Sequence, residues 1–278
     1  MMSTKIIGWY LWALCFFAVP TLAGDLSVDV RKGTSSPSDS NFIEVGLGVA
    51  VGKAPIYGLP EGNVDGETLT IGYVEINGRV QYKGFFLEAF SQSLEDFTFG
   101  YNFFNTDKWS LDVVSLEEHP ALDPEENDDY EGLKERKGDY MLGPRATAYF
   151  GKYIVQVNAL TDISGVHNGQ FFSVKVARHW QYKNWNYHAI LATSYRSQTI
   201  ADYYFSVNAQ DANEKFPEFH ASSGFNNVIE IGATYPISQK WVFRGFLRHF
   251  ELNSQWDDSP LIVTTHPTMV AASVSYVF

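Results

Sequence analysis

The sequence predicts an all-β protein: a transmembrane antiparallel up-and-down β-barrel of about twelve strands. Three observations carry this prediction. Residues 41–278 hold many short segments in which apolar and polar side chains alternate with the period of a strand. After the first 23 residues no apolar run approaches the roughly 20 residues of a spanning helix, and in lipid only helices and closed barrels satisfy their own backbone hydrogen bonds. Aromatic residues make up 16% of the chain and gather at one end of these segments.

Residues 1–23 predict a secretory signal peptide that is cleaved after Ala23. A basic start ending at Lys5 precedes an apolar run, and small residues stand where a signal peptidase needs them. The single cysteine, Cys15, lies inside that run, so we expect a mature chain without cysteine or disulfide. Residues 24–40 are polar and predict a periplasmic N-terminal lead-in, which leaves 41–278 for the barrel.

The charge of the chain argues against nucleic acid as a partner. The formal net charge is −12, which points to acidic loops. Residues 117–139 hold ten acidic residues against three basic ones and predict a solvated loop. These acids could collect divalent cations, but they lack the glycine-spaced ligand order of a calcium loop, so solvation is the preferred interpretation. The sequence predicts no metal site and no cofactor.

The strands follow from the alternation of apolar and polar residues. Asn77-Gly78 predicts the turn between the second and third strands, because a type I′ turn needs positive φ at both positions. The long loop at residues 195–223 is expected to hold its own extended piece at 203–208. The predicted strands are 43–52, 68–76, one centred on Phe85, Leu87 and Ala89, 97–103, 109–113, one ending at Phe150, 153–159, 171–180, 185–192, 229–235, 241–248 and 268–278.

Short turns and longer loops alternate along the chain, as in barrels with one rim in the periplasm and the other outside. Aromatic residues flank the short turns and predict a girdle at one membrane interface: Phe103, Trp109, Phe150, Tyr153, Trp180, Trp185, Tyr235, Trp241 and Tyr276. A soluble periplasmic sandwich or lipocalin-like barrel is the alternative. The girdle, and a second face too polar and too small to fill a twelve-stranded interior, favour the membrane. Arg178 falls on the lipid face, close to the rim, where a charge costs about 0–1 kcal/mol.

The last strand, residues 268–278, ends the chain on a phenylalanine. One face of this strand is predicted to contact lipid and to serve as the signal for the barrel-assembly machinery, as in the closing strands of bacterial outer-membrane barrels. The residues of this face are Val270, Ala272, Val274, Tyr276 and Phe278.

Polar residues on the opposite strand faces are predicted to face the lumen: Glu44, Asp112, Arg145, Gln156, Lys175, His188, Glu230, Arg244 and Arg248. Both signs of charge are present. In a narrow lumen such groups pair and fill the interior, because an unpaired charge away from water is costly. In a wide lumen they line a water column, and pairing is the preferred interpretation.

Two histidine-containing stretches invite a test for catalysis. A serine becomes a nucleophile only with a base within hydrogen-bond reach and a third group that orients the base. His220 and Ser222 are two residues apart, and His167 lies in another loop, but neither matches the motif of outer-membrane phospholipases. No catalytic residue is predicted, and we expect a protein that is not an enzyme.

Several short motifs, in their order along the chain, resemble the MipA/OmpV family of outer-membrane proteins. The similarity is strongest from Gly143 onward. It rests on Gly143-Pro144, Asn158-Ala159, Ser164-Gly165, His167, Tyr203-Tyr204-Phe205-Ser206-Val207, Ser223-Gly224, Asp258-Ser259-Pro260-Leu261 and Ser275-Tyr276-Val277-Phe278.

The resemblance implies a barrel in the outer membrane of a Gram-negative bacterium, without enzyme activity or cofactor. Its name-giving member is a scaffold between a lytic murein transglycosylase and a peptidoglycan synthase, and other members are surface antigens or adhesins. A scaffold meets its enzymes from the periplasm, where this sequence offers only tight turns and residues 24–40. A scaffold is therefore the leading hypothesis, and a surface adhesin or a small-solute pore is the alternative.

Overall fold

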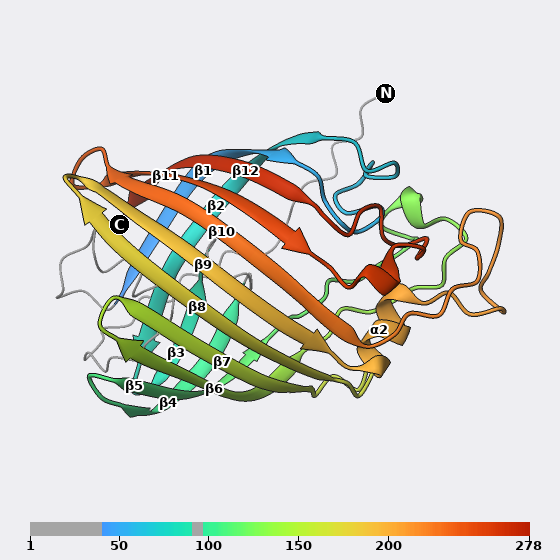
Figure 1. Cartoon of the computed structure of the whole chain (residues 1–278), viewed down its shortest axis with the longest axis horizontal. Helices are drawn as coiled ribbons and strands as arrows, with labels where there is room; N and C mark the ends of the chain where they lie inside the picture. Colours follow the sequence, from blue (N-terminus) through green and yellow to red (C-terminus); the bar gives the residue numbers. More distant parts are fainter. Residues whose placement is uncertain (1–40, 91–96) are drawn as a thin grey trace.

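The computed structural model describes residues 41–90 and 97–278. They form a closed barrel of twelve antiparallel strands in which β1 pairs with β12 (Figure 1), so the predicted fold class is confirmed. The expected signal peptide and lead-in, residues 1–40, lie outside the described residues. The strands are β1 (Phe42–Gly52), β2 (Leu69–Tyr82), β3 (Phe85–Ala89), β4 (Thr98–Asn105), β5 (Trp109–Leu116), β6 (Met141–Phe150), β7 (Tyr153–Asp162), β8 (Gln170–Tyr182), β9 (Trp185–Arg196), β10 (Gly224–Pro236), β11 (Trp241–Glu251) and β12 (Thr268–Val277).

Strand alternation sorts the side chains into an apolar outer face and a polar inner face. In β1, Leu47 is 72% exposed on the outside, whereas its near neighbour Glu44 is only 4% exposed on the inside. In β12, Val270 and Val274 are exposed and Ser275 is buried. This distribution suits a barrel with lipid around it and polar groups within it.

One predicted turn is wrong. β2 continues through Asn77-Gly78 to Tyr82, and the chain turns at Lys83-Gly84, where φ is +48° and +88° as a type I′ turn requires. Gly78 serves the strand instead, because a Cβ there would lie 2.5 Å from the carbonyl oxygen of Phe42 in β1. The long-range pairing of β1 with β2 therefore overrides the local turn preference of Asn-Gly.

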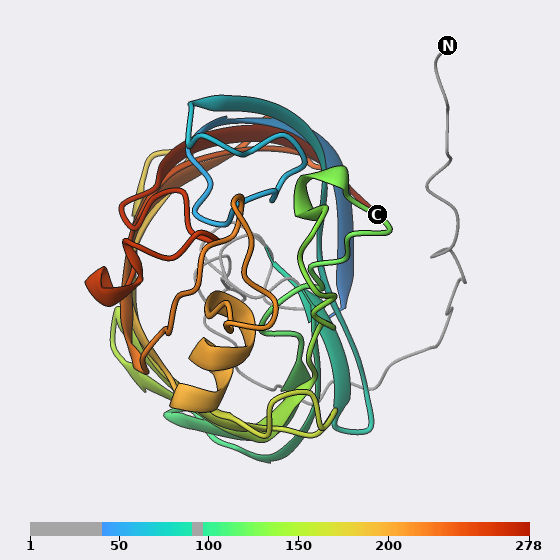
Figure 2. The same cartoon turned by 90° about the vertical axis from the view of Figure 1, so that its right-hand side faces the viewer.

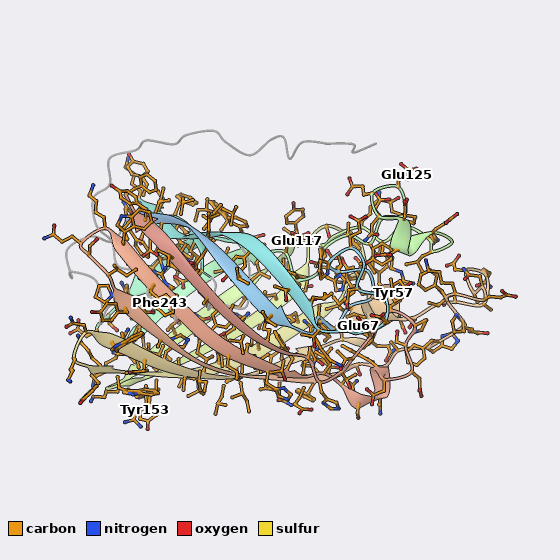
Figure 3. The ribbon with its side chains drawn as sticks, turned by 90° about the horizontal axis from the view of Figure 1, so that it is seen from above. Tyr57, Glu67, Glu117, Glu125, Tyr153 and Phe243 are labelled. Carbon is orange, nitrogen blue, oxygen red and sulfur yellow. The ribbon has the colours of Figure 1, made fainter. Side chains whose placement is uncertain are left out.

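The two rims of the barrel differ, as Figure 1 shows: tight turns close the end near the C-terminus, and the long loops gather at the other end. Aromatic side chains surround the tight turns, among them Trp241, whose ring lies 5.3 Å from that of Tyr276. Tyr153 points away from the barrel near this rim (Figure 3). Arg178 lies beside Tyr153: its guanidinium is 5.1 Å from the centre of the tyrosine ring, and its Nη1 donates to the phenol oxygen at 3.1 Å. The charge that Arg178 places on the lipid-facing side therefore lies at the membrane interface.

The loop at residues 117–139 is more ordered than the predicted solvated loop. It includes the short 3-10 helix Asp128–Tyr130, and it buries Leu122, Tyr130 and Leu133 against the other long loops. Glu125 and Glu126 remain exposed, and Glu125 stands at the outer edge of the long-loop end (Figure 3). Because the segment is strongly acidic, its composition does not reveal the few apolar residues that anchor the loop.

The extended piece predicted at residues 203–208 is wrong over its first half, whereas Val207 does form an isolated antiparallel bridge with Phe219. Residues Gln198–Phe205 form helix α2, which buries Ile200, Ala201, Tyr204 and Phe205. These residues recur at the spacing of one helix face, which is the signal that an extended interpretation misses. Among the described residues, no helix has both the length and the apolar character needed to cross a membrane. Figure 2 shows α2 and the neighbouring loops lying across the mouth of the barrel, and we call residues 117–140 and 197–223 the cap.

Candidate functional site

Within the part of the chain that the structure describes, the barrel interior contains three clusters of paired charges. The first, the Arg145 cluster, joins β2, β3, β5 and β6. Arg145 Nε donates to Asp112 Oδ2 at 2.9 Å, and its Nη1 donates to Glu88. Glu88 also accepts from Arg79 Nη1 at 3.0 Å. The ring of Phe86 lies against both guanidinium groups, 4.4 Å from that of Arg79 and 5.0 Å from that of Arg145, so the cluster is closely packed.

The Arg244 cluster lies at the seam where the last strands meet the first. Arg244 pairs with Glu44 of β1, and its Nη1 donates to Ser275 Oγ of β12 at 3.0 Å. Ser275 in turn donates to Glu75 Oε2 of β2 at 2.9 Å, and Arg244 lies 3.8 Å from the same oxygen. One guanidinium thus bridges two buried carboxylates across the closing strands.

The third cluster centres on Glu230 in β10. Its two oxygens face His188 Nε2 at 2.8 Å and Arg248 Nε at 2.6 Å. The remaining predicted lumen residues are also buried: Gln156 donates to Thr147 Oγ1 at 3.2 Å, and Lys175 lines a cavity near the long-loop end. Each predicted lumen residue therefore lies inside the barrel, and Glu44, Asp112, Arg145, His188, Glu230, Arg244 and Arg248 pair with one another or with neighbouring charges there.

Glu75, Arg79 and Glu88 belong to these clusters but are absent from the predicted set. The mistaken turn at Asn77-Gly78 cut β2 short and left Arg79 outside any predicted strand, whereas Glu75 and Glu88 lie within predicted strands but were not assigned to the lumen. When β2 is continued through Asn77-Gly78, its inner face consists of Tyr73, Glu75, Asn77, Arg79 and Gln81. A continuous period of two from residue 73 to 82 was the signal that could have found them.

Hydrogen bonds to Asp139 fix the base of the cap. Its Oδ1 accepts from the backbone N–H groups of Glu118 at 2.7 Å and His119 at 3.2 Å, and its Oδ2 lies 2.9 Å from His167 Nε2. Because His167 Nδ1 accepts from the N–H of Gly169 at 2.9 Å, Nε2 is the nitrogen that donates to Asp139. Arg136, also buried, donates to the carbonyl oxygens of residues 203 and 206, which ties the acidic loop to α2.

His119 is held neutral inside the cap. Its ring stacks on Tyr204 with 3.9 Å between ring centres, and Nδ1 lies 2.7 Å from the carbonyl oxygen of Pro120. Burial lowers the pKa of His119 to about 4. Burial also raises the pKa of the neighbouring Glu118 carboxyl above its usual range.

The cap should therefore lose stability on acidification. Because the folded pKa of His119 lies below the unfolded value of about 6.5, its contribution is complete above pH 6.5 and is lost as the pH falls through 4. We expect the free energy of unfolding to fall by up to about 3 kcal/mol over this window, at 1.36 kcal/mol per pKa unit. Denaturant unfolding across pH 7 to 4 measures it.

The variant His119→Gln should flatten this pH dependence, because glutamine does not titrate there. His220→Gln is the matched control, since His220 is an exposed histidine of the same cap. A pH profile that His119→Gln leaves as steep as in the wild-type chain would contradict the assignment. All of these chains share Glu118 and the other titrating groups. Comparing the slopes of the free energy of unfolding against pH between the chains therefore removes the contribution of those groups.

The residues tested for catalysis have separate partners. Ser222 Oγ hydrogen-bonds with Gln255, whereas His220 Nε2 faces Glu218 Oε1 at 3.2 Å. Within residues 41–90 and 97–278, no three His, Cys, Asp or Glu side chains are arranged to hold a metal ion.

The proposed assembly signal lies on the outside of β12 and just after it. Phe278 is 76% exposed, and its ring packs edge-on against Tyr276 with 5.0 Å between ring centres. The N–H of Phe278 donates to the carbonyl oxygen of Ile43 at 3.0 Å, which extends the seam to the last residue. Val270, Ala272 and Val274 lie on the same outer face.

Comparison with known proteins identifies relatives of this chain. Residues 45–278 match the family model described as MltA-interacting protein MipA. The chain is 24% identical over 158 residues to outer membrane protein Omp26La of Vibrio anguillarum and to outer membrane protein OmpV of Vibrio cholerae. Each alignment covers 57% of this chain and 62% of the relative, so the match spans less than two thirds of either relative. In-vitro folded OmpT of Vibrio cholerae, a solved structure, gives a TM-score of 0.40 at 7% identity over 87% of this chain and 98% of OmpT, which is too distant to support an argument.

The family model covers more than half of the chain, and both relatives are named as outer membrane proteins. The resemblance of the short motifs is thereby confirmed. This chain is a β-barrel protein of the outer membrane and belongs to the MltA-interacting protein MipA family.

Proposed function

We propose that this barrel is a non-enzymatic anchor that holds a murein transglycosylase, and through it a peptidoglycan synthase, at the periplasmic side of the outer membrane. The family description names the first of these partners. The observation that supports the proposal most directly is a ring of lysines at the rim of tight turns. Each of the five tight turns presents one exposed lysine: Lys83, Lys108, Lys152, Lys183 and Lys240.

This lysine ring stands out against the charge of the chain. Asp107 is the one acidic residue in the five turns, whereas the chain as a whole has a net charge of −12. Acidic residues outnumber basic ones in the four longest described loops at the opposite rim. Tight turns face the periplasm in outer-membrane barrels, so the positive rim is the one that meets periplasmic partners.

Tyrosines hold several of these charges at the rim. The ammonium groups of Lys83, Lys183 and Lys240 each lie 5.2 to 5.4 Å from the centre of a tyrosine ring, and Lys240 Nζ donates to the Tyr276 hydroxyl at 3.0 Å. A positive surface of this kind attracts and orients an acidic partner. The interior agrees with an anchor better than with a small-solute pore, because its charges pair with one another beneath the cap.

Replacing the five lysines with glutamate should abolish partner capture. We expect at least about tenfold less transglycosylase to co-purify after crosslinking, because like-charge contacts across an interface cost several kcal/mol. The matched control changes Lys53, Lys134 and Lys137 to glutamate, since these exposed lysines lie at the opposite rim. Heat-modified migration in gels verifies that each variant is folded.

Two results would overturn this proposal. Absence of the enzyme from the wild-type sample, under conditions that preserve a known envelope complex, removes the anchor function. Equal capture by the five-lysine variant removes the lysine ring as the docking surface.

A further inference from the structure

We propose that a cavity beneath the cap binds a small zwitterion with an apolar body, the class to which apolar α-amino acids belong. The cavity has a volume of about 210 Å³ and lies at the long-loop end of the barrel. Strands β8 to β11 supply its wall, while residues 117–120 and Phe205 of α2 approach from the cap. This site is at the opposite end from the lysine ring, so the inference does not depend on partner docking.

Unpaired polar atoms mark the cavity as a binding site. Four residues of its lining each hold one buried polar atom without a hydrogen-bond partner: Glu118 Oε2, His119 Nε2, Arg196 Nε and Asn226 Nδ2. Buried polar atoms normally find partners, because leaving them unpaired costs free energy. Four such atoms around one cavity therefore indicate a missing group that can bond to them.

The four atoms comprise two acceptors and two donors. Glu118 Oε2 is a carboxylate oxygen, and His119 Nε2 is a lone-pair nitrogen, because Nδ1 carries the proton that faces the Pro120 carbonyl oxygen at 2.7 Å. Arg196 Nε and Asn226 Nδ2 both carry N–H groups. A ligand ammonium satisfies the acceptors, and a ligand carboxylate satisfies the donors.

The formally charged side chains that line the cavity, Glu117, Glu118, Lys175 and Arg196, sum to zero, which favours a ligand without net charge. Glu118 and Arg196 already form an ion pair with each other, so neither charge calls for a separate counter-ion. A zwitterion can lie beside this pair with its own charges reversed, so that the ammonium meets Glu118 and the carboxylate meets Arg196. A ligand with one charge alone would satisfy one side of the pair and face a like charge on the other.

The remaining lining fits an apolar body. Aromatic and aliphatic side chains form most of it, among them Phe171, Phe205, Phe250, Leu252, Trp256 and Ile262. A dry cavity of about 150 Å³ holds a benzene ring, so 210 Å³ accommodates a side chain of the size of leucine or phenylalanine. Glu117 and Pro120 line the cavity and are exposed, which places its opening at the surface of the cap.

Calorimetric titration of the full chain in detergent micelles tests this inference, with L-phenylalanine as the probe. We expect saturable binding with one site per barrel. Phenylacetate lacks the ammonium and 2-phenylethylamine lacks the carboxylate, so each loses the charged hydrogen bonds of one end and should bind at least about tenfold more weakly. Equal binding of either analogue would refute the zwitterion, and no saturable binding of phenylalanine would refute the site.

A pair of substitutions in β9 locates the binding. Ala192 lines the cavity, so Ala192→Phe should fill it and abolish binding without removing any polar group. Ala189→Phe is the matched control, because Ala189 pairs with Ile231 and Arg178 on the outer face of the same region of the wall. Retained binding in Ala192→Phe, or equal loss in both variants, would place the ligand outside this cavity.

Discussion

Replacing Arg145 with methionine should destabilise the barrel by about 3–5 kcal/mol, the cost of removing one partner from a buried ion pair. Asp112 is fully buried and accepts from Arg145 Nε at 2.9 Å, so its carboxylate would lose this guanidinium. Glu88 would keep Arg79 but lose its second cation. Denaturant unfolding of the purified barrel in detergent or lipid measures the change.

Two further variants separate charge from packing. The double variant Arg145→Met with Asp112→Asn should recover much of the lost stability, because the neutral amide leaves Glu88 and Arg79 as the buried pair. Arg178→Met is the matched control, since it removes an exposed arginine of the outer face and should change stability by no more than about 1 kcal/mol. A single Arg145→Met variant as stable as the Arg178→Met control would contradict the buried-pair account.

The strand faces could be predicted from the sequence, whereas the partners inside the lumen could not. A period of two assigns Glu44 and Arg244 to the inner face of their strands, and both lie there. Their pairing depends on the register between β11, β12 and β1, which joins residues 200 positions apart. Register is a property of the closed sheet, so no local pattern contains it.

The error at Asn77-Gly78 shows how a local signal can compete with a longer one. An Asn-Gly pair favours a type I′ turn, but here the surrounding alternation continues unbroken from Tyr73 to Tyr82. The actual turn places Lys83 at φ +48°, a conformation that lysine rarely adopts, so composition alone does not mark it. Extending the alternation as far as it holds, before assigning the turn, gives the correct strand.

The cap and its cavity could not be predicted from the sequence for a different reason. Loops that look solvated by composition pack together through a few apolar residues, such as Leu122 and Tyr130. The cavity residues Glu118, Arg196 and Asn226 come from two strand ends and a loop that are distant in sequence. Their meeting depends on the cap folding inward over the barrel, and the strand pattern carries no information about that.

Replacing Phe278 with alanine should lower the amount of folded barrel in the membrane several-fold while leaving the folded barrel nearly as stable. The ring is 76% exposed on the outer face and contacts Tyr276, so its loss removes little buried surface. The backbone N–H that donates to Ile43 is kept in the alanine variant, so the seam retains its last hydrogen bond. A fall in the yield of folded barrel without a fall in its stability is expected for a residue that the assembly machinery recognises and that the folded barrel does not need.

Quantifying the heat-modifiable folded band in outer-membrane fractions gives the yield, and denaturant unfolding of the purified variant gives the stability. Phe225→Ala provides the matched control, because Phe225 is 61% exposed and is the second residue of β10, at the opposite rim and away from the closing strand. Equal yields of the Phe278→Ala and Phe225→Ala variants would mean that the terminal ring is an ordinary lipid contact. A Phe278→Ala variant that loses stability and yield together would instead place its role in the folded seam between β1 and β12.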